Sequence, residues 1–409
     1  MREPAWTIRR LGHLGDGIAE GPVYAPMTLP GEVVSGVLDA GRLRDVRIMS
    51  PSDQRVRPPC RHFKSCGGCS VQHGSDALVA GWKQEIVHGA LAAQRLEAGF
   101  LPMHVSPAAT RRRATFSAKR TRKGALAGFH GSASDMIVDI PDCRILHPNL
   151  KSGPALAEAL ATAAASRKGE ISVSVTVTEG GLDVHVTGGK PLDGPLRMAL
   201  ADVARQGRLS RLTWEEETLY LSAPPVQRFG AAEVVPPPGA FLQATKDGEA
   251  TLVGDVQAHL RDAGRIVDLF AGCGTFTFPL AEEAQVHAVE GEVAMVAALE
   301  AGWCNVQGLK AVTAEARDLF REPLSAQELG AHDAVLLDPP RAGAEAQVRE
   351  LAGSGVARIA YVSCSPVSFA RDARILVDAG YTLAALRVVD QFRWSPHVEL
   401  VARFDLVAG

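Results

Sequence analysis

The segment Asp268–Gly274 constrains the fold of this chain more than any other. It reads as the end of an apolar strand that runs directly into a glycine loop, and residues 275–282 can begin a helix after it. A helix that starts after such a loop points its free N–H groups at a ligand, an arrangement that commonly holds nucleotide-like cofactors. The segment therefore predicts an α/β domain with a cofactor site at the carboxyl ends of its strands.

The region around this loop alternates apolar strands with helical stretches, the order expected of a doubly wound parallel sheet. A full dinucleotide fingerprint needs a third glycine after Gly274, but threonine and phenylalanine stand there. Glu290 ends the next strand, at about the spacing where a carboxylate takes ribose hydroxyls. These features favour a nucleoside cofactor. The expected strands are 265–270, 286–290, 310–313, 334–337, 359–364, 383–389 and 398–404.

Length and charge bear on the partners. A chain of 409 residues is expected to form two or three domains. No stretch approaches the ~18 apolar residues of a membrane helix, and the first residues lack the apolar core of a secretion signal, so the sequence predicts a cytoplasmic protein without a membrane partner. The formal net charge of −3 hides an asymmetry, because residues 1–123 carry 19 Lys and Arg against 10 Asp and Glu. Solvated surface charge is one explanation; three basic clusters in one segment favour RNA as the partner.

Three domains are predicted. Residues 1–52 read as short strands broken by glycine turns, typical of a small β-barrel. Residues 53–240 read as a mixed α+β domain, with helices at 78–98 and 154–166 and a hairpin formed by 171–177 and 182–186. A proline-rich string at 236–239 marks the boundary to the sheet domain, residues 241–409.

Four early cysteines have the spacing of a metal site. Cys60, Cys66 and Cys69 are separated by five and two residues, and Cys143 follows later. In a chain without a secretion signal this pattern indicates metal binding rather than disulfides. Four thiolates fit either zinc or an iron–sulfur cluster, and the spacing does not choose between them.

Two residues near the C-terminus are candidates for covalent chemistry. Cys364 follows the apolar run 359–362, at the carboxyl end of a strand, where open α/β sheets bind ligands. A thiolate there can attack a flat electrophile, provided that its pKa is lowered locally; a small buried cysteine is the alternative. Glu399 stands in the apolar strand 398–404, where a carboxylate is costly unless it has a task or a salt-bridge partner.

The string Asp338-Pro339-Pro340-Arg341 ends a buried strand and is similar to a loop of amine-methylating enzymes. Those enzymes stack their substrate on an aromatic residue, whereas this chain has Arg341, which argues against amine methylation.

In combination these motifs resemble class I S-adenosylmethionine methyltransferases and, more narrowly, the RNA uracil-5-methyltransferase family. Residues 1–52 resemble a TRAM domain, an OB-like RNA-binding barrel. The family usually has Asn at position 245, Cys at 271 and often Asn at 275, where this chain has Thr, Ala and Thr. The matching segments stand in the family's order and are 241–245, 268–275, Glu290, Asp318, 338–343, 363–366 and 397–399.

The resemblance implies a reaction and its cofactors. Cys364 would add to carbon 6 of a uracil, and Glu399 would later remove the proton from carbon 5. The four early cysteines would hold a [4Fe–4S] cluster, zinc being the less expected ion. The implied cofactor is S-adenosylmethionine, and its expected binding residues are Gln243, Phe270, Thr275, Glu290, Asp318 and Asp338.

The resemblance favours a uridine of 23S rRNA as substrate, and the T-loop uridine of tRNA is the alternative with the same chemistry. A non-catalytic RNA-binding or assembly factor is the alternative from another class. Cytosine methylation is disfavoured, because enzymes of that kind use a second cysteine after a proline where this chain has Asp338-Pro339-Pro340. No obligate protein partner is evident.

Overall fold

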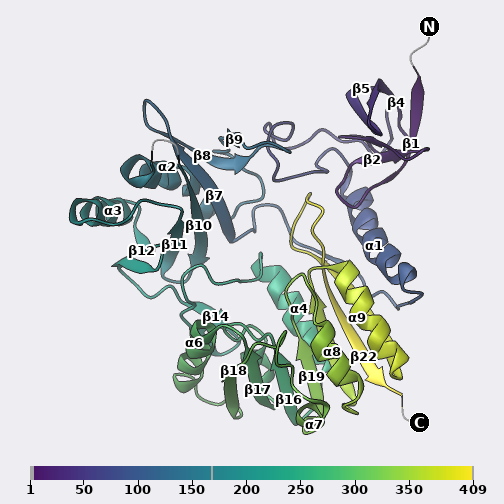
Figure 1. Cartoon of the computed structure of the whole chain (residues 1–409), viewed down its shortest axis with the longest axis vertical. Helices are drawn as coiled ribbons and strands as arrows, with labels where there is room; N and C mark the ends of the chain where they lie inside the picture. Colours follow the sequence, from purple (N-terminus) through teal and green to yellow (C-terminus); the bar gives the residue numbers. More distant parts are fainter. Residues whose placement is uncertain (1–3, 167–168, 408–409) are drawn as a thin grey trace.

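The structure of the protein is a computed structural model that describes residues 4–166 and 169–407. Figure 1 shows a small barrel near the N-terminus, a central α+β region and a large sheet region that ends at the C-terminus. None of the helices in these described residues combines the length and the apolar character that crossing a bilayer requires.

The N-terminal strands close into a barrel in the order β1-β2-β3-β5-β4, which confirms the predicted OB-like architecture. Its interior is apolar and includes Ile8, Val34 and Leu43, because alternate residues of each strand point inward. A tight turn at Gly12–Gly15, in which the Gly15 N–H donates to the Gly12 carbonyl at 3.0 Å, joins the first two strands. The strands are β1 Ala5–Leu11, β2 Gly17–Ala19, β3 Val23–Ala25, β4 Val33–Asp39 and β5 Arg42–Ser50.

Helix α1 (Asp76–Ala93) joins the barrel to the large sheet. The Ser75 hydroxyl caps its first turn by accepting a hydrogen bond from the Leu78 N–H, and Trp82 donates to the Gly12 carbonyl of the barrel at 3.0 Å. The helix ends earlier than the predicted residue 98, since Arg95 adopts a left-handed backbone (φ 55°) that a helix does not tolerate.

Helix α1 and strand β6 (His104–Val105) depart from the predicted division of the chain. The sequence places them in the central domain 53–240, whereas α1 packs against α9 and β6 pairs with β21 of the C-terminal sheet. The reason is burial: Val87 and Leu91 of α1 lie in the apolar core of that sheet. The connection in Figure 1 accordingly passes from the barrel down beside α9 before it enters the central region.

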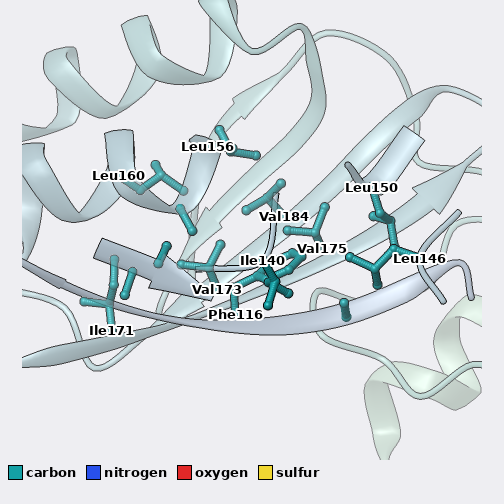
Figure 2. Packing of buried hydrophobic residues seen from close by; sticks show 14 of the residues in the cluster. Phe116, Ile140, Leu146, Leu150, Leu156, Leu160, Ile171, Val173, Val175 and Val184 are labelled. Carbon is teal, nitrogen blue, oxygen red and sulfur yellow. The ribbon is translucent and has the colours of Figure 1, made fainter. Parts of the chain in front are cut away.

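The central region is a seven-stranded sheet with two helices on one face, in the strand order β13-β12-β11-β10-β7-β8-β9. Figure 2 shows Leu156 and Leu160 of α2 packed over Phe116, Val173 and Val175 of the sheet. The predicted hairpin is present as β10 and β11, antiparallel. The elements are β7 Arg113–Arg120, β8 Ala125–His130, β9 Ile137–Val138, η1 Pro148–Leu150, α2 Gly153–Ala164, β10 Glu170–Thr178, β11 Gly181–Thr187, α3 Gly194–Gln206, β12 Leu209–Trp214 and β13 Glu217–Leu221.

The C-terminal sheet has eight strands in the order β18-β17-β16-β19-β20-β22-β21-β6. Helices cover both faces, which confirms the doubly wound α/β fold. The small pair β14 (Gln227–Phe229) and β15 (Ala232–Val234) precedes it. The elements are α4 Lys246–His259, β16 Arg265–Leu269, α5 Thr277–Leu280, β17 Gln285–Glu290, α6 Val293–Cys304, β18 Val312–Ala316, α7 Ala326–Leu329, β19 Ala334–Leu337, α8 Glu345–Ala352, β20 Arg358–Ser363, α9 Pro366–Asp378, β21 Tyr381–Asp390 and β22 Glu399–Leu406.

The sheet is mixed, and in this respect the prediction of a parallel sheet is wrong at one edge. Strands β16 to β20 are parallel, but β22 runs antiparallel to both β20 and β21. β21 is followed directly by a short loop and β22, so the last two strands form a hairpin that needs no crossover helix. This reversal determines where Glu399 lies.

Candidate active site

The glycine loop lies at the carboxyl end of β16 and holds a tight backbone turn. Phe270, Gly272 and Gly274 all have positive φ angles, and a Cβ atom on Gly274 would collide with the Phe278 ring, so only glycine fits there. The predicted helix 275–282 is shortened to the single turn α5, whose first residue Thr277 donates from its hydroxyl to the buried Asp268 carboxylate at 2.6 Å. Burial raises the pKa of Asp268 to about 7.

Glu290 ties this loop to the next strand. Its carboxylate accepts hydrogen bonds from the Gly272 N–H and the Glu292 N–H, both at 2.9 Å. These two bonds fix the loop against the end of β17, and Gly272, Glu290 and Glu292 line one wall of a cavity there.

That cavity, called the glycine-loop cavity below, has a volume of about 500 Å³ and lies across the carboxyl ends of the parallel strands. Every residue that the sequence offers as a cofactor ligand lines it, although these residues come from distant segments of the chain. These cofactor-binding candidates are Gln243, Phe270, Thr275, Glu290, Asp318 and Asp338. The two candidates for covalent chemistry, Cys364 and Glu399, line the same cavity.

Cys364 occupies the junction between β20 and α9. Ser365 caps α9 by accepting a hydrogen bond from the Ser368 N–H, so the strand ends and the helix begins on either side of the thiol. Burial raises the pKa of Cys364 to about 11, and the neighbouring carboxylates of Glu399 and Asp338 act in the same direction while Arg341 opposes them. The protein alone therefore does not lower the thiol pKa, because burial, the largest effect, and the two carboxylates all act against the thiolate.

Glu399 is brought to Cys364 by the antiparallel final strand. In the pairing of β20 with β22, Ser363 stands opposite Leu400, so the start of β22 meets the end of β20. The Glu399 side chain is 3% exposed, and its Oε2 atom has no hydrogen-bond partner among the described residues. Burial raises its pKa to about 8, against the opposing effect of Arg341.

A second cavity, the arginine cavity, opens on the other side of these two residues. It has a volume of about 660 Å³, and it shares Phe241, Arg341, Cys364 and Glu399 with the glycine-loop cavity. The thiol and the carboxyl group therefore stand where two cavities meet, one at the strand ends and one between the sheet domain and the central region.

The arginine cavity is lined by cations that lack carboxylate partners. Arg111, Arg113 and Arg341 form no ion pair with a carboxylate in residues 4–166 and 169–407. Arg113 lies over the Phe241 ring at 4.8 Å and Arg111 over the Phe392 ring at 5.7 Å. Burial, together with the neighbouring arginines, lowers the pKa of Arg113 to about 10. Such a site suits an anion flanked by flat apolar groups.

Arg111 and Arg113 belong to the basic clusters of residues 1–123 that predict an RNA partner, whereas no sequence pattern predicts a role for Phe392. That phenylalanine lies in the loop between β21 and β22, and nothing in its neighbourhood marks it as part of a site. Only the packing of the loop against the central region places it there.

The four early cysteines converge although Cys143 is far from the others in the chain. Cys60, Cys66, Cys69 and Cys143 line one small cavity, and all four are free thiols. Burial raises the pKa of Cys69 to about 12. In the described part of the chain, no three His, Cys, Asp or Glu side chains are grouped so as to hold a single metal ion.

Known proteins share this architecture. Residues 240–403 match the tRNA (uracil-5-)-methyltransferase family. The chain is 45% identical over 408 residues to an uncharacterized RNA methyltransferase of Rhizobium meliloti, with 98% of each protein covered. It is 33% identical to the 23S rRNA (uracil(1939)-C(5))-methyltransferase RlmD of Chromohalobacter salexigens, covering 96% of this chain and 87% of that protein. The fold is similar to the crystal structure of the Pyrococcus abyssi tRNA (uracil-54, C5)-methyltransferase in complex with S-adenosyl-L-homocysteine, with a TM-score of 0.75, 20% identity and coverage of 98% and 100%.

Proposed function

The chain belongs to the RNA uracil-5-methyltransferase family, and from that premise we propose that it methylates carbon 5 of a uridine in 23S rRNA through a covalent adduct on Cys364. One observation carries the mechanism: Cys364 and Glu399 line both the glycine-loop cavity and the arginine cavity. A nucleophile and a base at the junction of two cavities can act on a base held in one and a donor held in the other.

The glycine-loop cavity suits the donor. Glu290 and Asp318 offer carboxylates at the strand ends, and Phe270 and Phe320 offer aromatic faces with ring centroids 5.6 Å apart. S-adenosylmethionine bound there would supply a methyl group on a positively charged sulfur. A positive charge in this cavity would also lower the pKa of the Cys364 thiol, which burial and, to a smaller extent, the carboxylates otherwise hold high.

The arginine cavity suits the RNA. Arg111, Arg113 and Arg341 form no ion pair with a carboxylate among the described residues and can contact phosphate oxygens, and Phe241 and Phe392 offer surfaces on which a base can stack. The target uridine must leave its stack to reach Cys364, since carbons 5 and 6 of a stacked ring are inaccessible to a side chain.

The chemistry then divides between two side chains. The Cys364 thiolate bonds to carbon 6 of the uracil, and the electron pair of the 5,6 double bond makes carbon 5 nucleophilic enough to take the methyl group. Glu399, as the ionised carboxylate, accepts the proton from carbon 5. The bond between sulfur and carbon 6 breaks, the thiolate leaves, and the double bond returns.

The test uses two variants and a matched control. Cys364→Ala should abolish 5-methyluridine formation and the covalent trapping of 5-fluorouridine RNA while S-adenosylhomocysteine still binds. Glu399→Gln should allow the adduct to form and to persist. Cys304→Ala, which changes an exposed thiol on α6, should behave as the unmodified protein. Methyl transfer by Cys364→Ala would show that the nucleophile is another residue.

The substrate assignment rests on the RlmD relative, which is a 23S rRNA (uracil(1939)-C(5))-methyltransferase. Mapping 5-methyluridine in ribosomal and transfer RNA from cells with and without the gene separates this proposal from methylation of the tRNA T-loop. A non-catalytic RNA-binding or assembly role is disfavoured, because the family consists of enzymes. The TRAM-like barrel, residues 1–52, and the seven-stranded central region would hold the folded RNA against the catalytic sheet, on which α1 and β6 also pack.

We further propose that the four early cysteines hold a [4Fe–4S] cluster. Four free thiols around one cavity fit a four-thiolate site. We prefer a cluster to zinc because the four-cysteine pattern resembles the cluster-bearing branch of the family, whereas the spacing of the cysteines fits both. Iron and acid-labile sulfide in equal amounts, lost in Cys69→Ser, would support the cluster; one equivalent of zinc would contradict it.

A further inference from the structure

The β21–β22 loop (residues 391–398) lines the arginine cavity and precedes Glu399, which lines both cavities. It carries Phe392 and His397 into the arginine cavity and leads directly into Glu399, the first residue of β22. Its position therefore determines where the Glu399 carboxylate stands relative to Cys364, which comes from a different strand.

Both ends of this loop are held by one buried lysine of helix α1. The Lys83 Nζ atom donates to Asp390 Oδ1 at 2.5 Å, to the Phe392 carbonyl at 3.0 Å and to the His397 carbonyl at 3.0 Å. The side chain is fully buried, at 0% exposure, and these three bonds use all three of its N–H donors.

What distinguishes Lys83 is which acceptors it uses. A buried ammonium group needs an acceptor for each of its three N–H groups, and pairs of this kind can often be replaced by apolar residues without loss of stability, so stability alone does not require a lysine here. Here the two carbonyls, of Phe392 and His397, lie close to either end of one loop, so the ammonium group links the two ends of the loop.

Further contacts bind the loop to the cysteine segment and to the motif around Gln243. The Trp394 carbonyl accepts from the Ser70 N–H at 2.7 Å and from the Val71 N–H at 3.1 Å, directly after Cys69. The Gln391 amide donates to Gln243 Oε1 at 2.7 Å. Since Gln391 and Trp394 are held by these other contacts, Lys83 mainly fixes the end of the loop at His397, just before β22.

We propose that Lys83 is a positioning residue for proton removal, which holds the β21–β22 loop so that Glu399 faces the adduct on Cys364. This inference rests on the proposed function, since it assumes that Glu399 is the base. Cys364 follows β20, which pairs with β19 independently of the loop, whereas Glu399 comes directly after the loop. Loss of Lys83 should therefore impair the step that needs Glu399 and spare the addition of the thiol.

The test removes the three hydrogen bonds of Lys83 without leaving an unpaired buried charge. In Lys83→Met combined with Asp390→Asn, no charge is isolated, and the asparagine oxygen still accepts from the Phe392 N–H, as Asp390 Oδ1 does at 2.9 Å. The matched control is Arg211→Met combined with Asp183→Asn, which removes a buried ion pair of the central sheet that is joined by bonds of 2.8 and 2.7 Å. Single-turnover reactions with S-adenosylmethionine and substrate RNA then measure the denaturant-stable protein–RNA adduct and 5-methyluridine over time.

We expect the adduct of the Lys83 double variant to form at close to the normal rate and to decay about 100-fold more slowly, the order of effect of a 1 Å misplacement of a catalytic group. The control pair should leave both rates unchanged. Equal loss of formation and decay, or normal decay, would overturn the positioning role. Glu399→Gln, measured in parallel, separates the assignment of Glu399 as the base from the positioning role of Lys83. If Glu399→Gln accumulates no adduct, the assignment of the base fails, and the inference about Lys83 fails for that reason.

Discussion

Replacing Glu399 should change how the stability of the protein depends on pH. The carboxyl group has a pKa of about 8 in the folded protein against an ordinary value of 4.5, because it is buried. A carboxyl group whose folded pKa lies above its unfolded value takes up a proton on folding. Its contribution to stability is therefore fully present below pH 4.5 and is lost as the pH rises towards 8.

The size of this effect follows from the two pKa values. Between pH 6 and pH 8 the unfolded chain is ionised at this position and the folded chain is protonated, so stability falls by about 1.4 kcal/mol for each pH unit. Above pH 8 both states are ionised and the loss stops. From pH 6 to pH 9 the unmodified protein should therefore lose about 3 kcal/mol relative to Glu399→Gln, whose side chain does not titrate.

Denaturant unfolding of both proteins at pH 6 and pH 9, followed by tryptophan fluorescence, measures this double difference. Trp394, 7% exposed in the loop before Glu399, serves as a local probe. All other titrating groups cancel between the two proteins, apart from those that interact with position 399. A double difference near zero, or one in which the unmodified protein gains stability relative to the variant as the pH rises, would refute the buried, unpartnered state of this carboxyl group.

Three further predictions test other parts of the site. Cys364, with its pKa near 11, should react with iodoacetamide at pH 7 about 100-fold more slowly than an ordinary thiol of pKa 9. Above pH 8, Glu399→Gln should speed this reaction, because it removes a negative charge beside the thiol. Peptide mass spectrometry measures the rate of alkylation, and equal rates in the variant and the unmodified protein would contradict the effect of Glu399 on Cys364. Arg113→Leu should weaken RNA binding and reduce the slope of log affinity against log salt by about 1, measured by fluorescence anisotropy; an unchanged slope would exclude a phosphate contact. Glu290→Gln should weaken binding of S-adenosylhomocysteine about 10-fold by calorimetry, as loss of a charged hydrogen-bond acceptor at the loop implies, and unchanged affinity would exclude Glu290 from the cofactor site.

Much of the site could be predicted from local sequence. The apolar run into Gly272 and Gly274 requires a strand followed by a tight turn, and the run into Cys364 requires a strand end. Such patterns depend on residues a few positions apart, and the structure contains both strands. The spacing of Cys60, Cys66 and Cys69 is also local, but the approach of Cys143 to them depends on the fold.

The direction of the last strand is an example of what local sequence did not reveal. An apolar strand pattern is the same whether the strand runs parallel or antiparallel, so β22 read as one more strand of a parallel sheet. Its reversal brings Glu399 to the end of β20. The same holds for helix α1, whose lysine at position 83 shows no sign in the sequence of bonding to residues about 310 positions away.

What the sequence by itself determined is the set of local elements, their order and the residue types able to carry out the chemistry, because backbone propensity and apolar periodicity act over a few residues. The tertiary structure alone decided the electrostatics. The pKa values of Cys364 and Glu399 depend on which charges and how much water surround them, and both are set by packing between segments that are distant in the chain.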